Sequence, residues 1–192
     1  MIAIANTSHC ELTPRRRDNT NDKGKSIMKR ATLFAIASVA LLGLSAPAIA
    51  GVEVNTATGA VIVAGKPAPG LAAHGFDVVA YFKQSKPQQG DARFALVHNN
   101  ATYRFASEEN LAAFEADPGK YEPAYGGYCA YGVSVGAKFD GDPRYWKIVD
   151  GKLYLNLDAA IQSTWLKDVP ASIRKVDANW PKLASKLPSE LN

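Results

Sequence analysis

The stretch Trp146-Lys147-Ile148-Val149-Asp150-Gly151-Lys152-Leu153-Tyr154-Leu155-Asn156 predicts a β-hairpin. Apolar side chains occupy alternate positions on both sides of Asp150-Gly151, and Asp-Gly is a favoured two-residue hairpin turn. Residues two apart on a strand point to the same side of a sheet, so each arm has one apolar face. These faces consist of Trp146 and Ile148 on the first arm and Leu153 and Leu155 on the second.

A second hairpin is predicted for residues 93–107, because two alternating arms flank Asn99-Asn100, a pair that tolerates the positive φ of a tight turn. The alternating residues are Phe94, Leu96 and His98 on one arm and Tyr103 and Phe105 on the other.

Helices are predicted for residues 77–83, 107–116, 158–165 and 170–180. The first three begin at side chains that cap helices well, and the last begins at a proline. The β-branched pair in Asp77-Val78-Val79 is also compatible with a strand in place of the first helix. Pro118 and Pro181 are expected to end two of the helices. Strand pairs and helices do not strictly alternate, so the expected class is α+β: a small single domain with two antiparallel hairpins packed with several short helices. The capping or starting residues are Asp77, Ser107, Asp158 and Pro170.

An export signal precedes this domain. An apolar run of about a dozen residues, 33–44, follows Lys29-Arg30 and is followed by Ala48-Ile49-Ala50, a small-x-small cleavage pattern. The run is shorter than the roughly 20 residues that a membrane-spanning helix needs. We therefore expect cleavage near Ala50, no membrane anchor in the mature protein, and a periplasmic or secreted location.

The chain is therefore expected to have five parts. Residues 1–27 are an upstream extension from a misassigned start codon, and residues 28–50 are the secretory signal peptide. Residues 51–70 form an irregular arm with an edge strand, residues 71–182 form the domain, and residues 183–192 are a frayed tail.

Cleavage changes the composition of the protein. Residues 1–50 contain seven of the 22 basic and three of the 18 acidic residues, so the mature chain has no net charge and no electrostatic attraction to nucleic acid. Cys10, Met1 and Met28 also leave with this segment. Cys129 then remains as the sole cysteine, which excludes an intramolecular disulfide.

Cys129 lies in Tyr125-Gly126-Gly127-Tyr128-Cys129-Ala130-Tyr131-Gly132. Glycines allow close backbone approach, and N–H groups in such a turn lower the pKa of a thiol. A reactive or metal-binding thiolate is one interpretation, and a small buried apolar residue is the other. A metal site would need Cys129 together with His74 or His98, completed by tyrosine or carboxylate oxygens. For His98, and for Asp140 and Asp142 around Gly141, a place in a turn is the simpler interpretation.

Four blocks of sequence resemble the exported YHS-domain proteins. They cover about residues 71–182. The first block is Gly75-Phe76-Asp77-Val78-Val79-Ala80-Tyr81-Phe82, and the second is Tyr103-Arg104-Phe105-Ala106-Ser107-Glu108-Glu109-Asn110, which continues to Phe114, Asp117-Pro118 and Tyr121. The third is Gly126-Gly127-Tyr128-Cys129-Ala130, and the fourth is the Trp146…Asn156 hairpin. The metal-associated branch of that family has a Cys-Ser-x-x-Cys arrangement where this chain has Ala106 and Asn110. The exported branch centres on the Gly-Gly-Tyr-Cys block, and some of its members carry selenocysteine at the position of Cys129, which implies a reactive thiol.

Three functions follow as expectations. The first is an exported YHS-domain protein that binds a soft metal, copper first, through Cys129 and tentatively His74, since thiolates prefer Cu(I). The second is a thiol redox protein in which Cys129 acts with an external partner; an enzyme of this kind would be a thiol-dependent oxidoreductase. The third is an interaction module with an inert buried thiol. The partner in the first two would be an envelope redox or metal-trafficking protein.

Overall fold

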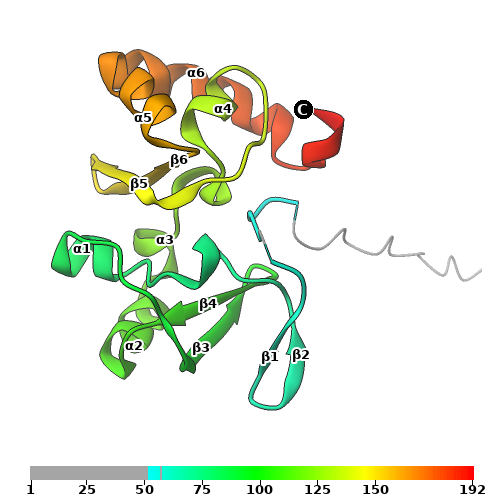
Figure 1. The fold of residues 1–192 in the computed structure, drawn as a ribbon, viewed down its shortest axis with the longest axis vertical. Coiled ribbons are helices and arrows are strands. Elements are labelled where there is room, and N and C mark those ends of the chain that lie inside the picture. Colours follow the sequence, from blue (N-terminus) through cyan, green and yellow to red (C-terminus); the bar gives the residue numbers. More distant parts are fainter. Residues whose placement is uncertain (1–51, 57) are drawn as a thin grey trace, which may run out of the picture. The chain divides into compact units, whose positions relative to one another are not determined.

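The computed structural model describes residues 52–56 and 58–192. In this part of the chain, several short helices accompany three two-stranded antiparallel sheets (Figure 1). The α+β class predicted from the sequence is confirmed. The expected signal peptide and upstream extension lie outside the described residues.

The elements follow one another in the order β1 (Val61–Val63), β2 (Lys66–Ala68), η1 (Ala73–Gly75), α1 (Ala80–Gln84), β3 (Asp91–His98), β4 (Ala101–Phe105), α2 (Glu108–Ala116), α3 (Pro118–Tyr121), η2 (Ala124–Gly127), α4 (Ala130–Ser134), β5 (Asp142–Val149), β6 (Lys152–Asn156), α5 (Ala159–Trp165), η3 (Leu166–Asp168), α6 (Val169–Leu183) and η4 (Pro188–Glu190), where η denotes a 3-10 helix.

Both predicted hairpins form. β5 pairs with β6 around Asp150 and Gly151, whose φ angles of 48° and 73° are the left-handed values that the turn requires. β3 pairs with β4 around Asn99 and Asn100, with φ angles of 46° and 57°. The arm over residues 51–70 is more regular than expected, because β1 and β2 form a third hairpin that turns at Ala64-Gly65.

Helix α1 begins three residues later than expected. Oδ1 of Asp77 accepts hydrogen bonds from the backbone N–H groups of Val79 and Ala80, but the N-cap position of α1 is Val79, so Asp77 forms a turn before the helix rather than the predicted cap. These bonds hold 77–79 as a turn, and the helical hydrogen-bonding pattern starts at Ala80.

One of the two prolines acts as predicted. Helix α2 ends at Ala116, before Asp117 and Pro118, and the Asp117 side chain then caps a further short helix, α3. Pro181 does not stop α6, which continues to Leu183. The helix persists because the backbone N–H of Ala184 still reaches the carbonyl of Trp180 and because Leu183 is buried in an apolar cluster.

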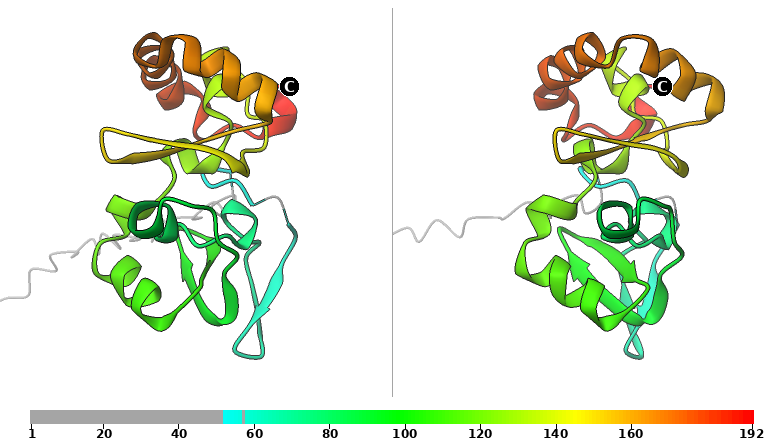
Figure 2. Two further views of the ribbon diagram at one scale, coloured as in Figure 1. Left: turned by 60° about the vertical axis from the view of Figure 1, so that its left-hand side comes forward. Right: turned by 90° about the vertical axis from the view of Figure 1, so that its left-hand side faces the viewer.

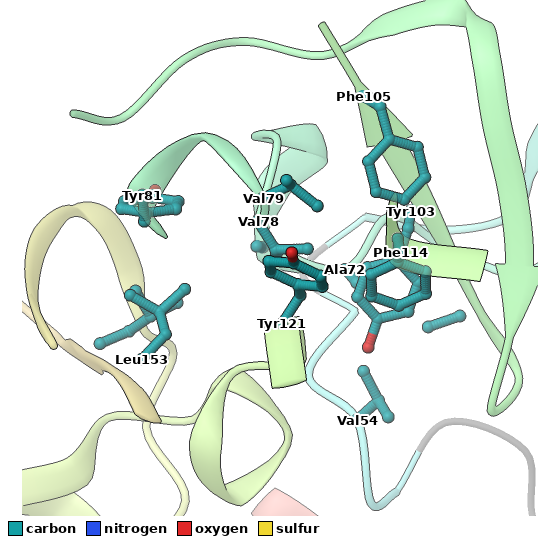
Figure 3. Close-up of a cluster of buried hydrophobic side chains, with 13 residues drawn as sticks. Val54, Ala72, Val78, Val79, Tyr81, Tyr103, Phe105, Phe114, Tyr121 and Leu153 are labelled. Atoms are coloured by element: carbon teal, nitrogen blue, oxygen red, sulfur yellow. The ribbon is translucent and has the colours of Figure 1, made fainter. Parts of the chain in front are cut away.

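The β5–β6 sheet separates the main core from the C-terminal helices (Figure 2). Leu153 and Leu155 point into the main core, which includes the aromatic residues of β4, α1 and α2 and is drawn in Figure 3. Tyr154 lies on the other face, where it packs against Trp165 of α5. Both faces of β6 are therefore covered, as its alternating pattern allows.

The C-terminal tail is packed against the domain rather than frayed. The Asn192 side chain exchanges hydrogen bonds with the backbone N–H and carbonyl of Lys138, at 3.1 and 2.9 Å. The backbone carbonyls of Ala184 and Lys186 accept hydrogen bonds from Lys138 Nζ. Across 52–56 and 58–192, no helix has the length and apolar character needed to cross a membrane.

Candidate functional site

Cys129 lies at the junction of η2 and α4. Tyr125, Gly126 and Gly127 have φ angles of 55°, 63° and 80°, so the chain turns sharply before Tyr128. The backbone N–H of Cys129 donates to the carbonyl of Phe139 at 2.9 Å, and Cys129 then caps α4, a helix of five residues.

The thiol of Cys129 is enclosed by backbone. Cys129 is 1% exposed, and its Sγ accepts hydrogen bonds from the backbone N–H groups of Gly132 at 3.4 Å and Leu157 at 3.3 Å. Burial raises the pKa of the thiol, while these two N–H groups oppose the rise to a smaller extent. The protonated, unreactive form is therefore favoured at neutral pH.

The first glycine of the Gly-Gly-Tyr-Cys block, Gly126, makes room for the N-terminal arm. A Cβ on Gly126 would collide with the backbone carbonyl of Glu53. Asn55, two residues after Glu53, donates its backbone N–H to the carbonyl of Gly126 at 2.8 Å. The close backbone approach predicted from the glycines occurs at Gly126, and residues 53–55 of the same chain make it.

His74, the tentative second metal ligand, has other partners. Its Nε2 lies 2.9 Å from both carboxylate oxygens of Asp140, and the side-chain amide of Asn55 donates to the same carboxylate. Cys129 makes its polar contacts with Gly132 and Leu157 instead. The structure thus brings His74 to Asp140 and Asn55, and gives it no hydrogen bond to Cys129.

The remaining candidates from the sequence also have structural partners. His98 Nε2 lies 3.0 Å from Glu122 Oε1, and its ring packs edge-on against Phe114. Asp142 pairs with Arg144, two residues along the same strand. The arginine lowers the pKa of the Asp142 carboxyl, which keeps it ionised and paired.

The residues around Cys129 do not fit a copper site. No group of three or more His, Cys, Asp or Glu side chains in the described ranges is arranged to hold a metal. The buried polar atoms near β6 that lack a described hydrogen-bond partner belong to the Asn156 amide and the Trp165 indole, and neither is a soft ligand. A single enclosed thiol offers Cu(I) one donor and no second soft atom.

Sequence reasoning missed Lys138, the most extensively bonded cation in this region. Lys138 is 1% exposed, and its Nζ donates to three backbone carbonyls and lies over the rings of Tyr128 and Trp180. Its local sequence, Gly136-Ala137-Lys138-Phe139-Asp140, carries no signal of this, because lysine is almost always a surface residue.

No family model, curated protein or solved structure matches the chain.

Proposed function

We propose that the mature chain is an exported, YHS-like interaction module in which Cys129 is a structural core residue. The observation that supports this most is the enclosure of the thiol, which is 1% exposed and hydrogen-bonded through Sγ to two backbone N–H groups. A buried thiol of raised pKa behaves as a small apolar residue with weak hydrogen-bonding capacity. This interpretation needs neither a resolving thiol nor a second metal ligand.

Alkylation of the folded protein tests the proposal. We expect iodoacetamide to modify Cys129 at least about a hundredfold more slowly in the native protein than in denaturant, because reaction must wait for local opening. The mass of the intact protein reports the modified fraction over time. Rapid alkylation of the native protein, with a pH dependence that gives an apparent pKa below that of an ordinary thiol, would favour the redox function instead.

A competition for Cu(I) tests the metal function separately. The native protein and Cys129→Ala are each mixed with the Cu(I) complex of bicinchoninate, whose absorbance falls when a protein removes the metal. We expect the two proteins to remove the same small amount. Stoichiometric removal by the native protein that is absent in Cys129→Ala would replace the interaction module with a copper-binding protein.

A further inference from the structure

Strand β5 has an edge that no other strand among the described residues covers. Its one partner in the sheet is β6. The outer edge of β6 is occupied, because Leu153 forms an isolated bridge with Pro123. Leu155 forms a second bridge there, with Cys129. The open edge of this hairpin therefore belongs to β5, and an edge of this kind can pair with an additional strand.

The register of the hairpin identifies the backbone groups that point out of this edge. Val149 and Lys152 flank the two-residue turn and form the hydrogen-bonded pair that closes it. Bonded and non-bonded positions alternate along an antiparallel pair, so Trp146 and Ile148 direct their N–H and C=O groups away from β6. As this orientation requires, the carbonyl of Trp146 accepts a hydrogen bond from Gln162 Nε2 of α5, at 2.9 Å. In the described part of the chain, no hydrogen bond outside the hairpin reaches the Trp146 N–H or either backbone polar group of Ile148.

An apolar groove lies beside the same edge. It has a volume of about 660 Å³ and is bordered by α1 and β5, and we call it the α1–β5 groove. Phe82 lines it from α1, and Trp146 and Ile148 line it from β5. These three side chains are half-buried and pack against the main core, so one side of each is fixed and the other is accessible. An added strand would find an apolar wall on this face.

The open part of the edge is short. At the beginning of β5, the hydroxyl of Tyr81 donates to the carbonyl of Pro143 at 2.8 Å, so α1 covers this end. At the other end, Asp150 and Gly151 turn the chain into β6. Residues 146–148 remain open, and a short extended segment is enough to cover them.

The opposite face of the sheet carries a positive charge at this edge. Lys147 lies between Trp146 and Ile148 and pairs with Tyr154, so its side chain points away from the apolar wall. Lys147 is exposed and takes part in none of the ion pairs formed by the described residues. A residue placed opposite Lys147 on an added strand would lie within reach of its ammonium group, and an acidic side chain would be favoured there.

We infer that the edge of β5 binds an extended segment of a partner protein with the pattern apolar–acidic–apolar, in antiparallel orientation. The residue opposite Ile148 would exchange two main-chain hydrogen bonds with it, and the residue opposite Trp146 would accept one from its N–H. Both apolar side chains lie against the wall of the α1–β5 groove, and the acidic one meets Lys147 on the other face. This inference rests on the proposed interaction module and gives it a class of partner.

The probe is the capped peptide acetyl-Ser-Thr-Val-Glu-Val-Thr-Ser-amide, titrated into the isotopically labelled protein purified after export. Amide hydrogen exchange is measured by nuclear magnetic resonance. Without peptide, exchange should be slow at Lys147 and Val149, which bond within the hairpin, and fast at Trp146 and Ile148. The peptide should slow exchange at Trp146 and Ile148 saturably, by about fivefold or more when the protein is nearly all bound.

Two altered peptides separate the main-chain and charge contributions. Methylation of both valine nitrogens removes the N–H groups that face β5, and this peptide should not bind. Replacement of the glutamate by glutamine should weaken binding about two- to fivefold, the range expected for one exposed ion pair.

Two protein variants assign the charge. With Lys147→Gln, the glutamate and glutamine peptides should bind equally. Lys152→Gln is the matched control, because Lys152 is exposed on the same face but lies on β6, one strand further from the edge. This variant should keep the two- to fivefold preference.

Four results would overturn the inference: no saturable protection, binding of the methylated peptide, equal binding of the two unmethylated peptides, or an unchanged preference in Lys147→Gln. Slow exchange at Trp146 and Ile148 before peptide is added would also overturn it, and loss of that protection on dilution would identify a second copy of the chain as the occupant. Failure here leaves Cys129 unreactive, whereas failure of the proposed function shows in the alkylation and copper measurements, so the two failures are distinguishable.

Discussion

The carboxylate of Asp77 accepts four hydrogen bonds from three segments of the chain. Oδ1 takes the N–H groups of Val79 and Ala80, and Oδ2 takes the N–H of Ala106 and the side-chain amide of Asn110, at 2.8 and 2.7 Å. The residue has no exposed surface. All acceptor positions of the buried Asp77 carboxylate are used, and its hydrogen bonds connect the beginning of α1, the end of β4 and α2.

Replacing Asp77 should therefore be costly. We expect Asp77→Ala to lower the free energy of unfolding by about 2–4 kcal/mol, because it leaves several buried N–H donors without an acceptor. Urea denaturation followed by circular dichroism measures the change. Asp158, an exposed residue that caps α5 through one hydrogen bond to the N–H of Ile161, provides the control. Asp158→Ala should cost about 1 kcal/mol, and equal losses in the two variants would contradict the role of Asp77.

At the scale of elements, the turn before Cys129 and the N-terminal arm require each other. Gly126 and Gly151 both have positive φ, at 63° and 73°, but only Gly126 faces backbone, namely that of Glu53 and Val54. The space beside Gly151 is open. An added methyl group therefore strains the backbone at both positions and displaces a neighbouring segment at one.

This difference predicts unequal effects of the same substitution. Gly151→Ala should cost about 1 kcal/mol, the usual penalty for a left-handed conformation without glycine. Gly126→Ala should cost more, and it should increase hydrogen exchange at Asn55, whose N–H bonds the carbonyl of Gly126. Denaturant unfolding and amide exchange provide the two measurements. Equal destabilisation, or undisturbed exchange at Asn55, would show that the arm accommodates the methyl group.

The elements that could be predicted from the sequence are those with local causes. Asp150-Gly151 and Asn99-Asn100 determine their hairpins through the φ angles of two residues each, and Ser107 caps α2 through a neighbour three residues away. The later start of α1 also has a local cause in the turn made by Asp77. The continuation of α6 past Pro181 has a cause that is distant in the sequence, because Leu183 is buried against residues such as Val133.

The candidate site was less predictable, since the burial and the hydrogen-bond partners of its residues depend on parts of the chain that are far apart in sequence. The thiol of Cys129 is enclosed partly by Leu157, 28 residues along the chain, and His74 is paired with Asp140, 66 residues along. No spacing rule relates such positions. A sequence can therefore mark Cys129 as chemically interesting while leaving its exposure, and hence its reactivity, undetermined.

Lys138 joins both ends of the described chain to the domain. Nζ donates to the carbonyl of Val52 at 2.7 Å and to those of Ala184 and Lys186 at 2.7 and 2.8 Å. The Tyr128 hydroxyl donates to the same Val52 carbonyl, at 3.1 Å. Val52, close to the expected cleavage position near Ala50, is thus part of the packed fold, and Lys138 connects it to the C-terminal tail through hydrogen bonds.

Burial gives this connection a dependence on pH. It lowers the pKa of Lys138 to about 8, against the smaller opposing effects of Glu53 and Glu190. In the unfolded chain the lysine keeps its ordinary pKa, about 10.4. Between these values the unfolded state binds more protons than the folded state, so the contribution of Lys138 to stability rises with pH. Below about pH 8 both states are protonated, and the contribution is constant.

Comparison with Lys138→Met isolates this effect. We expect the difference in unfolding free energy between the native protein and Lys138→Met to grow in favour of the native protein from about pH 7.5 to pH 9.5. Urea unfolding across this range measures it, and ionising tyrosines cancel because both proteins contain them. Lys167→Met, which removes an exposed lysine, should give a difference that does not vary with pH. If the difference in unfolding free energy for Lys138→Met is also constant across this pH range, the pH-dependent role of Lys138 is contradicted. The three carbonyls and two aromatic rings would then keep Lys138 protonated despite its burial, and a charged lysine would join the two ends of the described chain at every pH tested.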